Sequence, residues 1–186
     1  CARALRCRYH GWRWGLDGVL VEAPGAADFS GGSPEGRVRL AELACAVRFG
    51  FVWISLAPAP EPIDAFLEPI RALLEQLRPD DFELEEERLV AVECNWKTSV
   101  DVHNEAYHIR SLHPELAGVV DDAAIRIEIL ERHSAIRVPL RERSHEEKVQ
   151  VYVFPNVQLN FGEASLELYR HWPDARDPLR ARFEEH

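Results

Sequence analysis

The chain has 186 residues, of which 46% are hydrophobic, and a formal net charge of −10 at pH 7, so it is long enough to bury a sizeable core. The negative charge argues against a nucleic-acid partner, which would require a basic surface. The uninterrupted apolar runs are far shorter than the roughly 20 residues of a membrane-spanning helix, so we expect no membrane partner either.

The first 56 residues are predicted to be rich in β-structure. Two apolar, aromatic-rich runs flank Asp17-Gly18, and an Asp-Gly pair is a strong signal for a β-hairpin. Residues 26–36 are rich in Gly, Ser and Pro and are predicted to form a loop. Residues 45–56 follow as a single predicted strand, in which Gly50 is expected to mark a bulge.

The Ala- and Pro-rich residues 57–62 can continue neither a sheet nor a helix, and we expect them to link two domains. Between residues 63 and 77, apolar residues recur with the three- and four-residue spacing of an amphipathic helix. Residues 82–94 alternate well enough to predict a further strand.

The next segment, NWKTSVDVHNEAYHIRSLHPEL, covers residues 95–116 and concentrates histidines and carboxylates. We predict a helix over residues 96–110, on which Asp101, Glu105 and His108 form one stripe. His103 follows a different stripe, so we expect it to point away from the other three.

His113 lies five residues after His108, which is about 140° away on a continuous helix. Pro114 follows directly and disfavours helical geometry at His113. We therefore expect the helix to end near Ser111, which would allow the two imidazoles to converge.

Four further runs are predicted to form one antiparallel sheet. They are residues 125–130, 134–140, 148–154 and 166–171. The chain contains no internal repeat, and the order of β-structure, helix, and then helix with sheet predicts an α+β fold with two unequal domains.

The four cysteines do not have the spacing of a disulfide framework, which favours a reducing, cytoplasmic setting. All of the basic residues except Lys97 and Lys148 are arginine, and together with abundant alanine this indicates a bacterial gene. Methionine is absent, so we expect the chain to be a piece of a longer polypeptide.

Two imidazoles and a carboxylate with open coordination positions are the ligand set of non-haem Fe(II) oxygenases, although a lone pair of histidines at a helix end is more commonly polar surface. A second signal comes from CRYHGW, in which Cys7 and His10 form a C-x2-H motif followed by Gly11. A Rieske [2Fe–2S] centre takes two Cys on one iron and two His on the other, and this motif can supply one of each. Cys1 lies six residues upstream without a matching loop and is expected to be incidental.

With both motifs in view, the chain resembles the alpha (large, terminal oxygenase) subunit of the Rieske non-haem iron aromatic ring-hydroxylating oxygenases. LRCRYHGWRWGLDGVLVEAPG is similar to the second cluster-binding loop and its hairpin, and GFVWISLAP to the strand that closes the Rieske domain. NWKTSVDVHNEAYHIRSLHP resembles the mononuclear-iron helix with its acidic-x2-His-x4-His pattern, and VYVFPNVQLNF resembles a strand late in the catalytic domain. The motifs occur in the family's order and cover nearly the whole chain.

The resemblance implies that residues 1–56 are the C-terminal part of a β-rich Rieske domain and residues 57–62 a linker. Residues 63–186 would then be a partial catalytic domain, with an antiparallel sheet flanked by helices.

The resemblance also implies metal ligands. Cys7 and His10 would bind the [2Fe–2S] cluster, one to each iron, and His108 and His113 would bind the catalytic Fe(II).

Glu105 takes the place of the acidic residue that links, by hydrogen bonds, a cluster-ligand histidine of the neighbouring subunit to an iron-ligand histidine of its own. The family more often has Asp here, so Glu105 adds one methylene of reach. Asp101, one turn earlier, is either a support for this bridge or a solvated helix carboxylate.

The chain departs from the family pattern at both ends. The family's first cluster loop, Cys-x-His, would precede residue 1, and the carboxylate that completes the iron site would follow residue 186. Asp174 and Asp177 follow Pro173 too early and are interpreted as turn residues. We therefore expect a fragment truncated at both ends, holding half of the cluster ligands and two of three iron ligands, that alone binds neither metal tightly and is inactive.

The implied function is that of a terminal oxygenase. A reductase or ferredoxin would supply electrons to the cluster, and the mononuclear iron would use O2 to hydroxylate an aromatic or related small organic substrate, as in aromatic hydrocarbon catabolism. Dioxygenation, mono-oxygenation and demethylation all stay open, and the family usually assembles as a trimer of alpha subunits, alone or with beta subunits. Two alternatives are a non-enzymatic Rieske electron carrier, which needs only about the first third of the chain, and a zinc-binding protein that uses the same four ligands.

Overall fold

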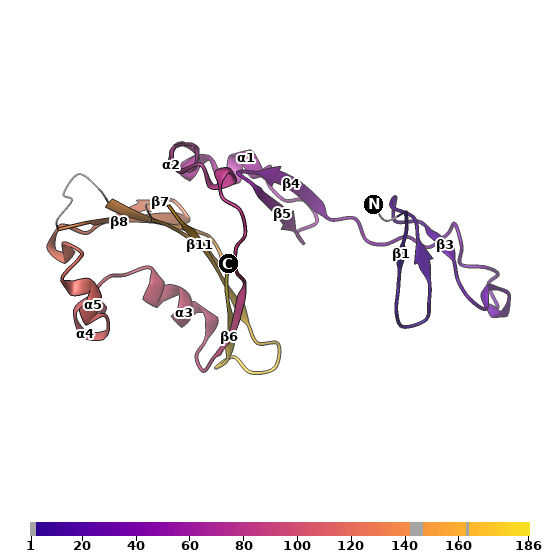
Figure 1. The fold of residues 1–186 in the computed structure, drawn as a ribbon. Helices are drawn as coiled ribbons and strands as arrows, with labels where there is room; N and C mark the ends of the chain where they lie inside the picture. The colour runs from indigo at the N-terminus through magenta and orange to yellow at the C-terminus, as the bar shows by residue number, and fades with distance from the viewer. Residues whose placement is uncertain (1–2, 142–146, 163) are drawn as a thin grey trace. The chain divides into compact units, whose positions relative to one another are not determined.

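The computed structural model describes residues 3–141, 147–162 and 164–186 (Figure 1). Cys1 and His145 therefore lie outside the described residues. The chain divides into two compact units, one formed by residues 1–46 and 52–60 and the other by residues 47–51 and 61–186. The domain limits expected from the sequence stay a prediction.

The first unit contains a three-stranded antiparallel sheet of β1 (Leu5–Arg6), β2 (Arg13–Trp14) and β3 (Leu20–Glu22). The predicted hairpin at Asp17-Gly18 is confirmed, because this pair connects β2 to β3 and Gly18 has a left-handed φ of 78°. A short 3-10 turn, η1 (Ala26–Asp28), lies in the predicted loop.

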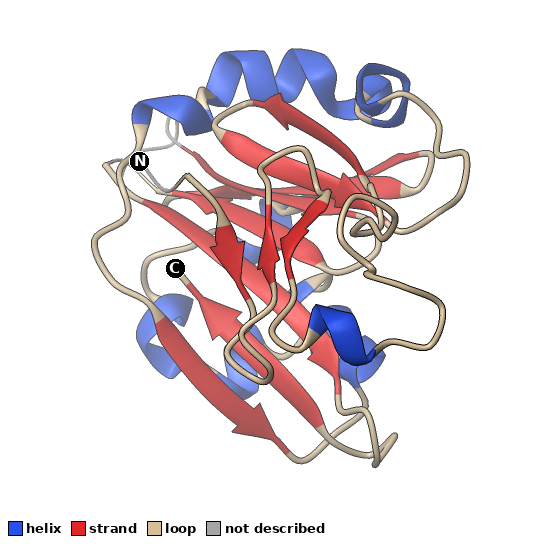
Figure 2. Ribbon diagram, turned by 90° about the vertical axis from the view of Figure 1, so that its right-hand side faces the viewer, coloured by secondary structure: helices blue, strands red, loops and turns tan. Residues whose placement is uncertain are grey.

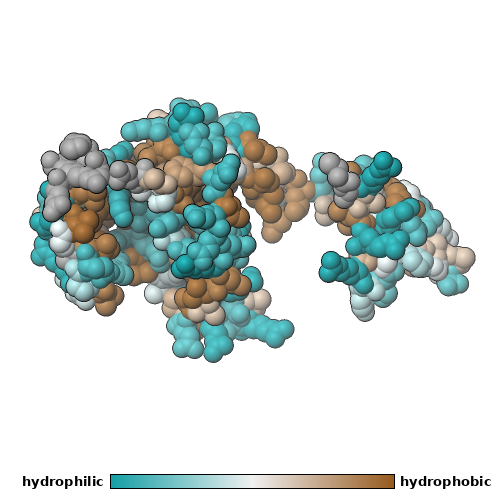
Figure 3. All heavy atoms as spheres, in the orientation of Figure 1, coloured by the Kyte–Doolittle hydropathy of each residue, from teal (hydrophilic) through white to brown (hydrophobic). Residues whose placement is uncertain are grey.

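The prediction of one strand over residues 45–56 is wrong. Two strands, β4 (Ala44–Arg48) and β5 (Phe51–Ser55), pair with each other as a two-stranded sheet. Phe49 and Gly50 connect them with φ values of 53° and 77°, the positive pair that a tight two-residue hairpin requires. The hairpin leaves large apolar side chains exposed, which form a brown patch in Figure 3: Val47, Val52 and Ile54.

The helix predicted over residues 63–77 is interrupted. It consists of α1 (Ile63–Phe66), the 3-10 turn η2 (Glu68–Ile70) and α2 (Arg71–Leu77), followed by η3 (Pro79–Asp81). Pro69 has no amide hydrogen to donate to the preceding turn, so the α-helical pattern breaks at this point. The predicted apolar stripe is confirmed by the burial of four of its members: Leu67, Ile70, Leu73 and Leu74.

The helix predicted over residues 96–110 is also shorter than expected. Helix α3 (Trp96–His103) ends early, and two one-turn helices, α4 (Ile109–Leu112) and α5 (Pro114–Ala117), follow after a break. The side chain of Asn95 begins α3 by accepting a hydrogen bond from the Lys97 amide at 2.9 Å. A 3-10 turn, η4 (Asp122–Ala124), leads from this region into the sheet. None of the helices in the described ranges is long and apolar enough to cross a membrane.

The second unit is built on a seven-stranded antiparallel sheet with the order β6-β12-β11-β10-β9-β8-β7 (Figures 1 and 2). Its strands are β6 (Arg88–Val92), β7 (Arg126–Leu130), β8 (His133–Pro139), β9 (Glu147–Val153), β10 (Val157–Phe161), β11 (Leu166–Pro173) and β12 (Ala181–Glu185). Four of them confirm the strands predicted after residue 124, whereas β10 and β12 were not predicted. This mixture of helices with antiparallel sheets confirms the α+β class.

The two faces of this sheet differ in polarity. Cross-strand partners lie on the same face, and one row of partners is apolar: Ala135, Val151, Leu159 and Leu168. The neighbouring row on the opposite face is polar: Ser134, Tyr152, Gln158 and Tyr169. Helices α1 and α2 lie over the apolar face, and α3, α4 and α5 lie over the polar face (Figure 1). The segment with the predicted iron ligands thus faces a polar sheet surface.

Candidate metal centre

The two predicted iron ligands occupy opposite ends of the one-turn helix α4. His108 precedes the helix as its N-cap and His113 follows it as its C-cap. His113 has the non-helical angles φ −124° and ψ 62°, as expected for a residue before proline. The imidazole centroids lie 5.3 Å apart with an interplanar angle of 67°, so the structure brings the two rings together.

Each of these imidazoles has a carboxylate at its Nδ1 atom. His108 Nδ1 is hydrogen-bonded to Glu105, which also accepts a hydrogen bond from the Tyr107 amide. His113 Nδ1 lies 3.2 Å from a carboxylate oxygen of Glu115, a contact that the sequence reasoning missed although the HPEL motif contains it. Because a carboxylate accepts the proton of Nδ1, each ring keeps its Nε2 lone pair free to bind a metal.

Glu105 is the more constrained of the two carboxylates. Partial burial raises the pKa of Glu105, but the hydrogen bonds from His108 and from the Tyr107 amide outweigh burial, and its pKa lies below the usual value for glutamate. Glu105 is therefore an anion at neutral pH and a fixed acceptor for the His108 ring.

The two rings fit the imidazole part of a mononuclear iron site. Two imidazoles that share one metal through Nε2 at about 2.1 Å have ring centroids roughly 5 Å apart, close to the observed 5.3 Å. Imidazole nitrogen is also a suitable donor for Fe(II). Within the described part of the chain, no three His, Cys, Asp or Glu side chains form a group that could hold a metal ion, and the role of His108 and His113 as iron ligands stays a prediction.

The predicted stripe of Asp101, Glu105 and His108 on one helix is wrong, because α3 ends at His103. Asp101 is exposed on α3, and burial together with the negative charge of Asp101 raises the pKa of Tyr152 on β9. Asp101 thus acts electrostatically on the sheet, and its support of a Glu105 bridge stays a prediction.

A contact with the sheet explains why α3 ends early. A continuing helix would require the Tyr107 amide to donate to the carbonyl of His103. In the structure the side-chain amide of Gln150, on β9, donates to that carbonyl, and the Tyr107 amide donates to Glu105 instead. The sequence could not reveal this break because Gln150 is 47 residues away from His103.

A chain of hydrogen bonds runs between α3 and the polar face of the sheet. The hydroxyl of Ser99 lies 2.8 Å from His171 Nδ1, and His171 Nε2 lies 2.9 Å from Gln158 Oε1. Gln158 Nε2 and the hydroxyl of Ser134 both donate to Asn104 Oδ1, at 3.4 and 3.3 Å. His171 and Gln158 are fully buried. Burial, followed by the nearby charge of a neighbouring histidine, lowers the pKa of His171 to about 4.

The remaining buried histidines are structural. His103 donates from Nδ1 to the carbonyl of Ser99 at 2.7 Å and stacks on Phe183, with centroids 5.3 Å apart. His103 thus packs against the sheet, in keeping with the expectation that it does not join the pair of ligands. His133 contacts the carbonyl of Phe66 through Nε2 and the amide of Phe154 through Nδ1.

The predicted cluster ligands lie in the first unit, on the loop between β1 and β2. Cys7 and His10 are both exposed. The Gly11 amide donates to the Cys7 carbonyl at 3.0 Å, and Gly11 has a left-handed φ of 75°, which glycine adopts without steric cost. The loop therefore presents one thiol and one imidazole at the surface of this unit, and their role as ligands stays a prediction.

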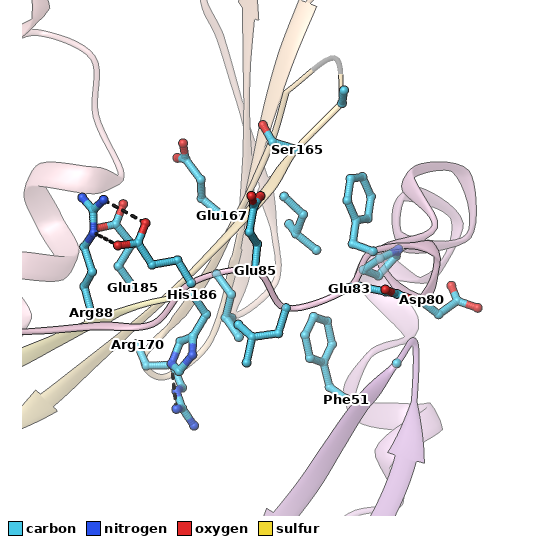
Figure 4. A pocket seen from close by; sticks show the side chains of 18 residues that line it. Phe51, Asp80, Glu83, Glu85, Arg88, Ser165, Glu167, Arg170, Glu185 and His186 are labelled. Atoms are coloured by element: carbon cyan, nitrogen blue, oxygen red, sulfur yellow. Dashed lines mark hydrogen bonds and ion pairs between the residues drawn. The ribbon is translucent and has the colours of Figure 1, made fainter.

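A cavity of about 630 Å³ lies elsewhere in the second unit (Figure 4). It is lined by the segment that precedes β6 and by parts of β11 and β12, and many of its side chains are carboxylates, including Glu83, Glu85, Glu167 and Glu185. Neither His108 nor His113 lines it, so this cavity is separate from the imidazole pair.

Comparison with known proteins agrees with the geometry. Residues 75–137 match the family model described as ring hydroxylating alpha subunit (catalytic domain). The chain is 33% identical over 112 residues to the glycine betaine monooxygenase oxygenase subunit of Chromohalobacter salexigens, covering 60% of this chain and 25% of that protein. It is 28% identical over 163 residues to the chloroplastic choline monooxygenase of Beta vulgaris, covering 81% of this chain and 36% of that protein.

The fold also resembles a solved structure. The quaternary ammonium Rieske monooxygenase CntA, in complex with an inhibitor, aligns with a TM-score of 0.85 and 21% identity, covering 100% of this chain and 52% of that one. At this identity the alignment establishes a shared fold. The chain spans about a quarter to a third of the two curated relatives.

Proposed function

We propose that this chain belongs to the family of ring-hydroxylating oxygenase alpha subunits, whose model it matches over residues 75–137, and that it is part of a terminal oxygenase that uses O2 to oxygenate a small organic substrate. The observation that carries the proposal is the convergence of His108 and His113, each with its Nδ1 atom on a carboxylate. Such carboxylate–imidazole pairs are typical of metal-ligating histidines.

His108 and His113 would hold a mononuclear Fe(II), and Cys7 and His10 would supply two of the four ligands of a Rieske [2Fe–2S] cluster. When bound, the iron supplies activation of O2 and the cluster supplies single electrons. A reductase or ferredoxin would be the electron donor, and the limits 1–56, 57–62 and 63–186 are proposed as the partial Rieske domain, the linker and the partial catalytic domain. The division of the chain into two units near residue 60 supports these limits.

Glu105 is proposed to connect the two metal sites between subunits of a trimer, with or without beta subunits. One of its carboxylate oxygens holds the proton of His108 Nδ1. Its side chain is 38% exposed, so it is accessible to a hydrogen-bond donor from a neighbouring subunit. Asp101 is proposed only as an electrostatic neighbour of this region.

A quaternary ammonium compound is the proposed substrate class, because the relatives described above are named for glycine betaine, choline and quaternary ammonium substrates. The expectation of aromatic hydrocarbon catabolism has less support from these names. The polar sheet face under α3 carries Tyr169 and also Tyr152, which lies near the carboxylate of Asp101. Aromatic faces and carboxylates both attract an organic cation.

The two alternatives derived from the sequence, a Rieske electron carrier and a zinc-binding protein, have less support than a terminal oxygenase. A Rieske electron carrier would need only about the first third of the chain, yet the family match covers residues 75–137. A structural zinc site of four protein ligands would need Cys7 and His10 of the first unit to join His108 and His113 of the second, whereas the curated relatives are named as monooxygenases.

A single-turnover experiment tests the proposal without knowledge of the electron donor. The complete gene product, reduced chemically, is mixed with O2 and with glycine betaine, choline or naphthalene, and the product is measured. We expect hydroxylated or demethylated product from a quaternary ammonium compound and none from naphthalene. Glu105→Gln is expected to keep the iron but to lower product formation about 10- to 100-fold. Protein with iron and cluster bound that forms no product from any of the three compounds would contradict the proposal.

A further inference from the structure

Hydrogen bonds from the sheet hold the turn between α3 and α4 in place. They reach the N-terminal end of the turn, whereas His108 and His113 follow it in the sequence. The side-chain amide of Gln150, which is partly buried on β9, donates to the carbonyl of His103, the last residue of α3. Strands β8 and β10 hold the next residue, because Ser134 and Gln158 both donate to Asn104 Oδ1. Three adjacent strands therefore each contribute one hydrogen bond to the point where α3 stops.

The Gln150 contact competes directly with continuation of the helix. In a regular α-helix the carbonyl of His103 would accept the amide hydrogen of Tyr107. Because Gln150 occupies that carbonyl, the Tyr107 amide is left to the carboxylate of Glu105. The same carboxylate binds His108 Nδ1, so the amide of Tyr107 and the ring of His108 together fix the orientation of Glu105.

We propose that Gln150 is a positioning residue for the metal centre: it stops α3 at His103 and so allows Glu105 to orient the imidazole of His108. This inference rests on the proposed iron-binding role of His108. Without the donor on Gln150, the helix can extend by a turn, because the sequence Glu105-Ala106-Tyr107 contains no residue that breaks a helix. On an extended helix, the Tyr107 amide would donate to the carbonyl of His103, and Glu105 would lose one of the two groups that fix its orientation toward His108.

The test compares two variants of the complete gene product. Gln150→Met keeps the length of the side chain and removes its hydrogen-bond donor. Ser99→Ala is the matched control, because it removes a hydrogen bond to His171 in the same buried region without touching the turn.

The first measurement needs no metal. Backbone 13Cα chemical shifts and amide hydrogen exchange are recorded for residues 104–107 of the iron-free protein. We expect the Gln150→Met variant to show helical shifts and slower exchange of the Tyr107 amide, whereas Ser99→Ala retains wild-type values. Wild-type shifts in Gln150→Met would overturn the inference, whether or not the protein binds iron.

The second measurement is iron affinity, together with the electron paramagnetic resonance spectrum of the Fe(II)–nitric oxide adduct. Residues behind a metal ligand contribute about 10- to 100-fold in affinity, so we expect Gln150→Met to bind iron about tenfold more weakly and with an altered spectrum. Ser99→Ala is expected to have a lower Tm with unchanged iron affinity. If the wild-type protein binds no iron, the proposed function fails, and the chemical shifts alone decide the role of Gln150.

Discussion

At the scale of single residues, the partners of the ring nitrogens distinguish the two proposed iron ligands from the buried histidines His133 and His171. His108 and His113 each engage Nδ1 with a carboxylate and leave Nε2 without a protein partner among the contacts described. His133 and His171 engage both nitrogens, with backbone groups and with neutral side chains respectively. A histidine with both nitrogens engaged has no lone pair left for a metal, so its partners, and not its position in the sequence, decide its role.

The neutral state of His171 makes stability depend on pH. The pKa of His171 in the folded protein is lowered to about 4, mainly by burial, whereas an unfolded histidine titrates near about 6.5. Its contribution to stability is therefore fully present above about pH 6.5 and is lost as the pH falls toward about 4, for a total of at most about 3 kcal/mol. Urea unfolding of wild type and His171→Gln across this range measures the effect.

We expect the variant to be less stable than wild type at neutral pH and to lose less stability on acidification. Some pH dependence will remain, because burial also lowers the pKa of His133 and of His103. Equal slopes of stability against pH for the two proteins would show that His171 is not the titrating group.

At the scale of secondary-structure elements, the sequence predicted features that depend on residues adjacent in the chain. The Asp17-Gly18 hairpin, the apolar stripe before residue 77 and the effect of Pro114 on His113 all follow from adjacent residues. The helix over residues 63–77 was predicted without its break, although Pro69 is a local signal. Two other predictions were wrong for different reasons. The hairpin at Phe49-Gly50 uses a bulky residue at positive φ, which is uncommon in turns, and α3 is ended by the distant Gln150.

The residues of the candidate site also differ in whether adjacent sequence could predict them. The proximity of His108, His113 and Glu105 was predictable because the three residues share one short motif, and their roles stay a prediction. The buried chain of hydrogen bonds through His171 was not, because its members come from α3 and three separate strands. Only the register of the sheet brings these side chains together.

The turn at Gly50 is predicted to be intolerant of a side chain. Gly50 has a φ of 77°, and an added Cβ would lie 2.9 Å from Cα of Asp80. Because the backbone is left-handed and an added Cβ would clash with main-chain atoms, we expect Gly50→Ala to lower the free energy of unfolding by about 2–4 kcal/mol. The control is Gly118→Ala, because Gly118 has a φ of −84° and an added Cβ there meets nothing within 4 Å. Thermal unfolding should show a clear drop in Tm for the first variant only, and equal values would contradict the steric argument.

At the scale of the whole molecule, each of the two units carries one of the two metal motifs. The C-x2-H loop belongs to the first unit, and the imidazole pair belongs to the second unit with the seven-stranded sheet. The order of the motifs in the sequence led us to expect two domains, and the limits of these domains stay a prediction. The resemblance implies that two further cluster ligands and one further iron ligand would complete the two motifs, and no group of three potential metal ligands occurs among the described residues.

Because the two motifs lie in separate units, we expect that the proposed cluster and the proposed mononuclear iron can be removed independently. In the complete gene product, Cys7→Ser is expected to abolish the Rieske electron paramagnetic resonance signal and the acid-labile sulfide while leaving the mononuclear iron. His113→Ala is expected to do the reverse, because it removes one of the two imidazoles that converge at α4. Iron and sulfide analysis of both proteins checks this, and loss of both metals in either variant would argue that the two sites depend on each other.

The placement of both imidazoles at the ends of α4 has a consequence for how the centre assembles. Closing a loop of about five residues costs little chain entropy, so the proposed pair of ligands would form a short-range chelate that needs only one helical turn. The orientation of the His108 ring depends instead on Glu105. Because Gln150 ends α3, this orientation also depends on strand β9, which lies far along the chain. Weaker tertiary packing should therefore change the angle between the imidazoles of His108 and His113 before it separates them. The motif would then still bind metal, but in the wrong coordination geometry.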